Sequence, residues 1–195
     1  MRRKVIAIAV VVVVVGALFG ILYRPYPSDR TPEGAYMRIA RSVRADEPAG
    51  FFAYLEQDAQ WACYTVRDMR AKARARVDRS YPEPQRSQLL AQYDAYAKAP
   101  DGQDVFAIYY RDRKWSNRLR RDISGAANVE MAGVRATIVT VRGTRWTFRK
   151  RPNGIWGITI YTAELLAESE KATRDLAVVD AAADDYDRVK AAKSN

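Results

Sequence analysis

Residues 143–160 read GTRWTFRKRPNGIWGITI, and this stretch decides the class of fold. Trp146 and Phe148 alternate with polar residues, and apolar residues alternate in the same way from Trp156 to Ile160. Alternation with a period of two is typical of β-strands that bury one face. The stretch therefore predicts an antiparallel hairpin with one apolar face and one basic face.

The loop of this hairpin fixes how its strands pair. A three-residue loop at 152–154 places Phe148 opposite Ile158 and Trp146 opposite Ile160, so that the apolar faces coincide. A loop of this length needs a left-handed position, which its last residue, a glycine, supplies. A two-residue loop would put the apolar faces on opposite sides of the sheet.

Further strands are predicted before this hairpin. A two-residue loop at Gly143-Thr144 would pair Val141 with Trp146 and Val139 with Phe148. An earlier strand near Val129 does not fit this register without a β-bulge. The predicted apolar face of the sheet, which would also line a ligand pocket if one exists, consists of Val139, Val141, Trp146, Phe148, Trp156, Ile158 and Ile160.

Helices are predicted before the sheet. Thr31-Pro32-Glu33 has the residues of a helix start: an N-cap, a first-position proline and an acid in the first turn. An apolar stripe from Phe52 to Val77 indicates a long helix with a break near Asp58, and another helix is predicted at 87–98. The segment 105–122 is ambiguous, and we expect a short helix followed by irregular structure.

The C-terminal part, residues 163–195, is predicted to be one long amphipathic helix. Its apolar positions recur every three or four residues but are few and small, and they include Leu176, Val179 and Tyr186. Such a helix either packs against its own domain or binds a partner through these three side chains. Its acidic residues would suit a basic surface on another protein or on this one.

The N-terminus carries an apolar run, Val5–Tyr23, directly after Arg2, Arg3 and Lys4. As a helix this run would span roughly 28 Å, which matches the hydrocarbon core of a bilayer. The apolar part of a cleaved signal peptide is shorter, about 7–15 residues. We therefore expect an uncleaved membrane anchor at 1–23, with a removed signal peptide as the alternative. The three cations favour an N-terminus inside the cytoplasm and a domain outside it.

The sequence thus predicts an α+β protein in four parts. They are a membrane anchor at 1–23, a linker at 24–30, an extracytoplasmic domain of helices packed on a curved antiparallel sheet at 31–162, and the C-terminal helix at 163–195. The predicted location is the inner, cytoplasmic membrane, with a single span.

The composition excludes several kinds of chemistry. The chain has no histidine, which removes the commonest general base and metal ligand, and its one cysteine, Cys63, lies beside an apolar stripe, as a core residue does. No phosphate loop, metal cluster or nucleophile motif is found. We expect no enzyme activity, no cofactor and no metal site. The net charge of +10 is explained by a solvated, arginine-rich face without a partner, or it suits anionic headgroups or an acidic protein; outside the cytoplasm it does not favour nucleic acid.

The order of elements, together with residues 143–148 and 153–158, resembles the nuclear-transport-factor-2-like (cystatin-like) α+β superfamily over roughly 31–162. The superfamily contains ketosteroid isomerase-like enzymes, small-ligand binders, and scaffolds such as the anchored inner-membrane subunit of type IV secretion systems. An isomerase site would need a carboxylate in the apolar pocket, and the inward sheet positions carry none. The long C-terminal helix departs from the pattern of the superfamily.

Two functions follow as hypotheses. The first is a membrane-anchored, non-catalytic interaction or assembly module of the cell envelope, held by lipids through its N-terminal helix and binding another envelope protein or its own copies. The alternative is a carrier of small apolar ligands, with its pocket on the inner face of the sheet.

Overall fold

The computed structural model describes residues 27–194, which form an α+β fold with a four-stranded antiparallel sheet and a long C-terminal helix. The predicted anchor at 1–23 and most of the predicted linker lie outside the described residues. None of the described helices is long and apolar enough to cross a bilayer.

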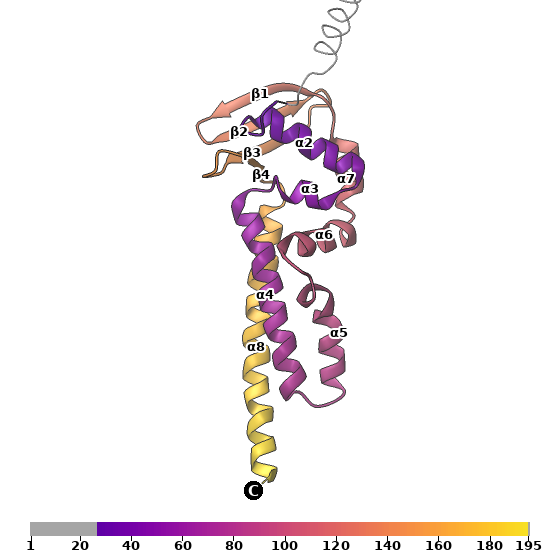
Figure 1. The fold of residues 1–195 in the computed structure, drawn as a ribbon, viewed down its shortest axis with the longest axis vertical. Helices are drawn as coiled ribbons and strands as arrows, with labels where there is room; N and C mark the ends of the chain where they lie inside the picture. Colours follow the sequence, from indigo (N-terminus) through magenta and orange to yellow (C-terminus); the bar gives the residue numbers. More distant parts are fainter. Residues whose placement is uncertain (1–26, 195) are drawn as a thin grey trace, which may run out of the picture.

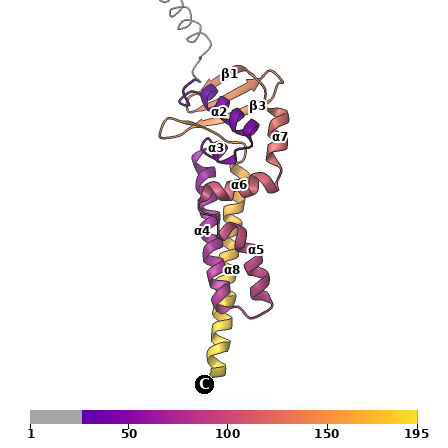
Figure 2. The same cartoon turned by 45° about the vertical axis from the view of Figure 1, so that its right-hand side comes forward.

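The described chain has two parts, a head and a stalk, and the two long helices of the stalk begin at the head (Figures 1 and 2). The head contains the sheet and the short helices. The stalk consists of the three helices that extend away from the head, α4 (Gln57–Ser80), α5 (Gln85–Ala97) and α8 (Thr162–Ser194). The helices of the head are α2 (Pro32–Ala45), α3 (Pro48–Phe52), α6 (Gly102–Asp112) and α7 (Trp115–Asp122). The strands are β1 (Ala126–Ala132), β2 (Arg135–Thr140), β3 (Arg145–Lys150) and β4 (Trp156–Ile158).

The start of α2 is as predicted. The Thr31 hydroxyl accepts a hydrogen bond from the Gly34 N–H at 3.2 Å, and Pro32 occupies the first turn. Asp46 ends the helix in the left-handed conformation. The predicted break near Asp58 is also confirmed, because residues 53–56 separate α3 from α4.

An aromatic cluster joins the helices of the head. Phe51 stacks on Phe106 with ring centroids 5.6 Å apart, and Trp115 stacks on Tyr161 at 3.8 Å. The expectation of a short helix within 105–122 is confirmed by α6, but irregular structure after it is wrong, since α7 follows. Trp115 and Leu119 are both buried, so tertiary packing stabilises this short, arginine-rich helix.

The last hairpin has the predicted register. Phe148 pairs with Ile158, and the loop closes with a hydrogen bond from the Gly154 N–H to the Arg151 carbonyl at 2.9 Å. Gly154 has a φ of +85°, the left-handed conformation that the loop was expected to need. The predicted pair of Trp146 and Ile160 lies beyond the end of β4 at Ile158, and both residues line the same small cavity.

The predicted register between β2 and β3 is wrong. Ile138, not Val141, pairs with Trp146, and Ala136, not Val139, pairs with Phe148. The cause is a four-residue connection, 141–144, in place of the expected two-residue loop. Thr140 holds this turn through its carbonyl, which accepts from the Gly143 N–H at 2.8 Å, and its hydroxyl, which accepts from the Thr144 N–H at 3.1 Å. An odd shift in register moves every side chain of β2 to the other face.

The two edges of the sheet differ. The strand order is β1-β2-β3-β4, so β1 and β4 are edges, and the expected bulge lies in β1 between Ala126 and Asn128. The Ile158 N–H donates to the Tyr54 carbonyl at 2.8 Å, and the Glu56 N–H donates to the Ile158 carbonyl at 3.1 Å. The segment before α4 therefore covers β4, whereas no described strand covers the outer edge of β1.

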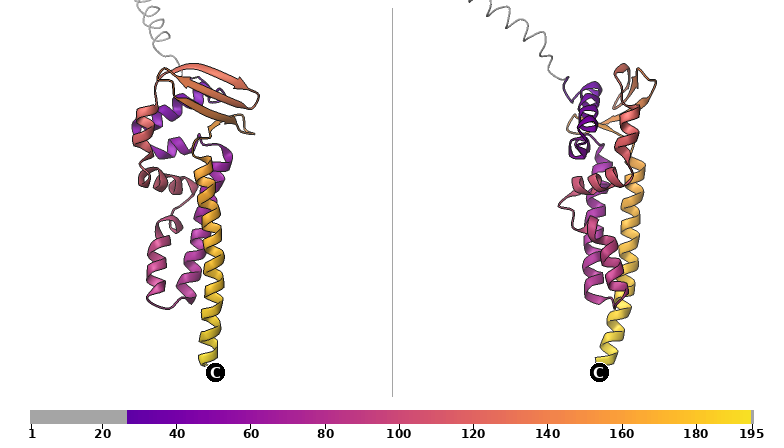
Figure 3. Two further views of the ribbon diagram at one scale, coloured as in Figure 1. Left: turned by 180° about the vertical axis from the view of Figure 1, so that it is seen from behind. Right: turned by 90° about the vertical axis from the view of Figure 1, so that its right-hand side faces the viewer.

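In the stalk, α4 and α8 leave the head together and run in parallel (Figure 3). Their contacts advance in the same direction along both helices, from Arg70–Asp175 to Ser80–Asp187. Beyond these contacts the Lys190 Nζ donates to the Ser80 carbonyl, 2.8 Å away, at the end of α4. A second apolar cluster fills the space between the three helices, with the buried residues Ala73, Val77, Tyr81, Tyr93, Val179 and Ala183.

Candidate interaction surface

The seven residues predicted to line a ligand pocket do not surround one cavity in the described structure. Four are packed into the core of the head: Trp146, Phe148, Trp156 and Ile158. Ile160 is half-buried against that core, but Val139 and Val141 belong to the opposite face, and Val141 is 74% exposed. This misplacement follows from the register shift of β2.

The space next to the predicted pocket is small. A cavity of about 130 Å³ lies between α7 and the sheet, and Trp146 and Ile160 are the two predicted residues that line it. Pockets for small organic ligands usually measure about 300–1,000 Å³. The inner face of the sheet is therefore filled mainly by its own side chains.

The three predicted partner residues of α8 pack within the chain. Val179 is buried in the stalk, and Leu176 and Tyr186 pack against the same cluster. Tyr186 meets Tyr81 edge to face with ring centroids 5.0 Å apart. The acidic residues of α8 meet a basic surface of the same chain, because Arg76 on α4 pairs with Asp180, Asp184 and Asp187.

The most unusual exposed residue is Trp61, in the first turns of α4, where the stalk meets the head. Its side chain is 58% exposed, whereas Trp115, Trp146 and Trp156 are all at most 5% exposed. A tryptophan offers a large apolar surface, and leaving it in water forfeits the free energy that its burial would supply. Trp61 therefore marks a candidate binding surface.

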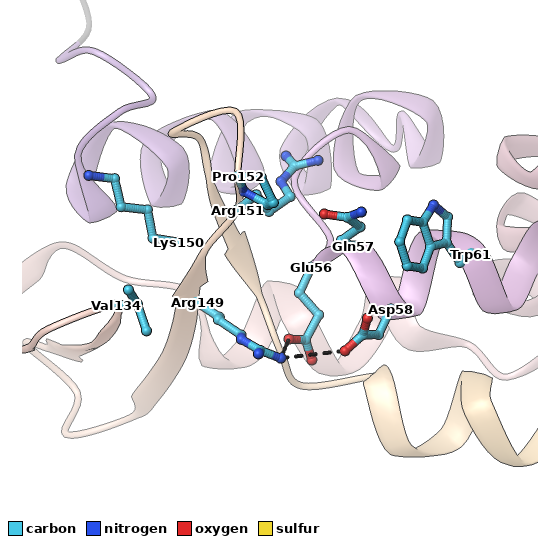
Figure 4. Close-up of a pocket in the computed structure, with 9 residues that line it drawn as sticks. All are labelled: Glu56, Gln57, Asp58, Trp61, Val134, Arg149, Lys150, Arg151 and Pro152. Atoms are coloured by element: carbon cyan, nitrogen blue, oxygen red, sulfur yellow. Dashed lines mark hydrogen bonds and ion pairs between the residues drawn. The ribbon is translucent and has the colours of Figure 1, made fainter.

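A charged hollow of about 450 Å³ lies on one side of Trp61 (Figure 4). Its walls come from the start of α4, from the β1–β2 turn, from the end of β3 and from the turn after β3: Glu56, Gln57, Asp58, Trp61, Val134, Arg149, Lys150, Arg151 and Pro152. The start of α4 and the sheet meet at this hollow because β4 binds the backbone before α4.

Ion pairs and hydrogen bonds fix the polar side chains of this hollow. The Arg149 Nη1 lies 3.4 Å from an Asp58 oxygen and 3.9 Å from an oxygen of Glu56, which is almost fully buried (Figure 4). Arg151 donates to the Gln60 side-chain oxygen at 3.1 Å and to the Ala53 carbonyl at 2.5 Å. Lys150 is exposed, and no described carboxylate lies within ion-pair distance of it.

A second hollow, lined by both apolar and polar side chains, lies on the other side of Trp61. It measures about 260 Å³, sits between α4 and α8, and is lined by Asp58, Trp61, Ala62, Thr65, Leu166 and Ser169. Leu166 is 39% exposed. The indole of Trp61 therefore lies between two hollows, a charged one and one of mixed character, on a helix that packs against α8.

The carboxylates of this surface are held in ion pairs. Both carboxylates of the charged hollow are engaged by Arg149, and no cluster of metal-ligating side chains occurs within residues 27–194. Burial raises the pKa of the Cys63 thiol to about 12, so at neutral pH this residue is a protonated core residue, as predicted. Burial likewise raises the pKa of Tyr161 and Tyr110.

Trp61 was absent from the residues predicted to be functional, although the sequence contains a signal for it. It lies off the apolar stripe of α4, which continues through Ala59, Ala62 and Val66. A tryptophan on the polar side of an amphipathic helix is a candidate contact residue. The wall that β3 contributes to the hollow beside Trp61 is more than eighty residues away in sequence. Only the folded structure shows that the two lie together.

No known protein family, curated protein or solved structure matches the chain. The likeness to the nuclear-transport-factor-2-like superfamily thus stays a prediction from element order and motif.

Proposed function

We propose that this protein is a membrane-anchored, non-catalytic interaction module of the cell envelope, and that the surface around Trp61 binds its partner protein. The observation that carries the proposal is an indole that is 58% exposed between two hollows, on a helix that packs against the rest of the stalk. Tryptophan and arginine dominate the binding energy of many protein interfaces, and such residues cluster in pockets at their centres.

The chemistry of the two hollows defines the partner segment. Leu166 and the indole offer apolar contact on one side, and Val134 and Pro152 offer apolar walls on the other. Lys150 lies at the rim without a described carboxylate partner. The matching segment carries apolar side chains that fit over Trp61 and a carboxylate that reaches Lys150.

The carrier of small apolar ligands is the weaker hypothesis. It depends on a cavity behind the sheet, and the cavity next to Trp146 measures only about 130 Å³. The hollows around Trp61 are open to the surface and carry charged walls, which suits a protein segment better than a small apolar molecule.

Site-specific photocrosslinking in membranes tests the proposal. A benzophenone amino acid is placed at Trp61 or, as a control, at Val178, which is 69% exposed on the stalk. A partner should crosslink from position 61 and not from 178, and the purified partner should bind the full-length protein about tenfold or more weakly after Trp61→Ala. Equal crosslinking from both positions, or unchanged affinity after Trp61→Ala, would contradict the proposed surface.

A reporter fused after Asn195 tests the anchor and the orientation separately. A reporter that is active only outside the cytoplasm should give a signal. Activity only from a cytoplasmic reporter would overturn the proposed topology.

A further inference from the structure

The outer face of α2 is an amphipathic surface that the Trp61 proposal does not use. Met37, Arg41 and Arg44 follow one another at intervals of four and three residues, so they share one side of the helix. All three are exposed, and Met37 is 39% exposed. The opposite side of α2, which includes Ile39 and Val43, is buried in the head.

A hollow of about 620 Å³ extends from this face to the start of β1. Its lining is largely apolar and small, with two arginines and one acid at its margins: Glu33, Tyr36, Met37, Ala40, Arg41, Arg44, Ala45, Ser124, Gly125 and Ala126. The Tyr36 hydroxyl closes the floor by donating to the Ser124 carbonyl at 2.6 Å. The hollow therefore combines an apolar floor with a cationic rim.

The positive charge of this surface is not neutralised within the described structure. No carboxylate of residues 27–194 lies within ion-pair distance of Arg41 or Arg44, and the same holds for Arg142. Arg142 stands beside the hollow, since its backbone N–H donates to the Ser124 hydroxyl at 3.4 Å and its Nη1 donates to the Arg121 carbonyl at 2.5 Å. These guanidinium groups would attract anionic groups such as phosphates.

The position of α2 in the chain limits what can cover it. Thr31 follows Tyr23, the last residue of the expected anchor, by eight positions. Eight residues reach at most about 28 Å even when fully extended. The N-terminal end of α2 must then lie close to the bilayer if the anchor spans it, and α2 is in the part of the molecule opposite the C-terminal end of α8 (Figure 1).

We propose that the face formed by Met37, Arg41, Arg44 and Arg142 lies on the anionic phospholipid headgroups of the membrane that holds the chain. This inference depends on the anchor in the proposed function but not on the Trp61 surface. The arginines bind headgroup phosphates, and Met37 enters the interface beside them, as apolar residues do in helices that lie on membranes. The contact orients the head so that the stalk points away from the bilayer.

Fluorescence quenching in nanodiscs tests the contact with the full-length protein. Met37→Cys is labelled with an environment-sensitive fluorophore, and brominated lipids serve as quenchers. Cys63 is buried and its thiol pKa is raised to about 12, so the label reacts with the introduced cysteine. We expect strong quenching at position 37 in phosphatidylglycerol-containing discs and at least about threefold less in pure phosphatidylcholine. A label at Val178→Cys should be unquenched in both.

Two charge-reversal variants supply the matched comparison. Arg41→Glu with Arg44→Glu should reduce quenching in anionic discs to the level seen in neutral discs. Lys72→Glu with Arg79→Glu changes the net charge equally on exposed positions of α4 and should leave the quenching unchanged. The melting temperatures of both variants, measured in the same discs, show whether the fold is kept. Unchanged quenching in a folded Arg41→Glu, Arg44→Glu variant would overturn the proposal.

The outcomes distinguish a failure of the proposed lipid contact from a failure of the proposed membrane anchor. A chain that alkaline carbonate does not release from membranes, but whose position 37 is unquenched in anionic discs, contradicts the lipid contact and leaves the anchor intact. A chain released by carbonate contradicts the anchor, and the lipid contact with it. If an added polyglutamate peptide shifts the emission of the label while anionic lipid does not, the face binds an acidic protein and the proposal is wrong.

Discussion

The guanidinium of Arg70 on α4 lies 2.6 Å from a carboxylate oxygen of Asp175 on α8. The same group lies over the ring of Tyr93 on α5, with 4.9 Å between the guanidinium carbon and the ring centroid. The Arg70 side chain is only 9% exposed. One buried cation therefore contacts all three helices of the stalk, and its charge depends on Asp175 for neutralisation.

Asp175→Asn should lower the free energy of unfolding by about 2 kcal/mol, because it leaves the buried Arg70 without its counter-charge. Glu170→Gln is the control, since Glu170 and Arg174 form an exposed pair at 3.7 Å on the same helix. Its effect should stay within about 0.5 kcal/mol. Urea unfolding followed by circular dichroism measures both values, and equal effects would contradict the special role of Arg70.

Truncation after Thr162 should destabilise the protein severely, with a melting temperature lower by many degrees or no cooperative transition. It removes Leu165, Ala172, Val179 and Ala183, all nearly inaccessible to solvent. Truncation after Lys190 removes exposed residues of α8 but keeps the contact of Lys190 with Ser80, and should change the melting temperature little. A chain cut after Thr162 that kept its melting temperature would show that α8 serves a partner and not the fold.

Gly154→Ala should cost roughly 1 kcal/mol of stability, because φ at this position is +85° and a Cβ disfavours that conformation. Space is not the cause, since the nearest atom to an added Cβ would be the Arg30 Nε at 4.0 Å. Thermal unfolding measures the change, and a neutral effect would contradict the strained turn.

Gly157→Ala should cost clearly more than Gly154→Ala, for a different reason. An added Cβ would lie 2.6 Å from the Glu56 Cα and 2.7 Å from the Glu56 nitrogen, both backbone atoms. The segment that covers β4 would have to move away, and the charged hollow beside Trp61 would lose the wall that β3 provides. A smaller loss of stability than for Gly154→Ala would show that this segment is loosely attached.

Stability should fall as the pH rises from about 9 toward about 12. Burial raises the pKa of the Cys63 thiol from 9.0 to about 12 and that of the Tyr110 phenol from 10.0 to about 12. The unfolded chain releases these protons at lower pH than the folded chain, so the unfolded state is increasingly favoured in this window. The full stability is present below about pH 9.

The variant Cys63→Ala isolates the part of this loss of stability at high pH that is due to the thiol. Its urea midpoint should fall less steeply between about pH 9 and pH 10 than that of the unmodified protein, whatever its absolute stability. Native Cys63 should also fail to react with thiol reagents near pH 8 and react fully in denaturant. Rapid labelling of the native protein, or identical pH slopes, would contradict the buried thiol.

Sequence alone determined the features that depend on nearby residues. Thr31 and Pro32 specify the start of α2, and the glycine at 154 fixes the loop that pairs Phe148 with Ile158. The break before α4 and the length of α8 follow from local composition and periodicity. Such features are predictable because caps, turns and alternation act over a few residues.

Tertiary structure decided what local patterns leave open. Residues 136–141 have apolar or β-branched side chains on both faces, so the β2–β3 register was set by the turn that Thr140 holds with its carbonyl and hydroxyl oxygens. Whether α8 packs on its own chain depended on Arg70 and Arg76 of α4 facing its acids. The charged hollow beside Trp61 depended on the meeting of segments that lie more than eighty residues apart in the sequence. Burial and charge pairing are properties of surfaces brought together by the whole fold, and a single segment does not encode them.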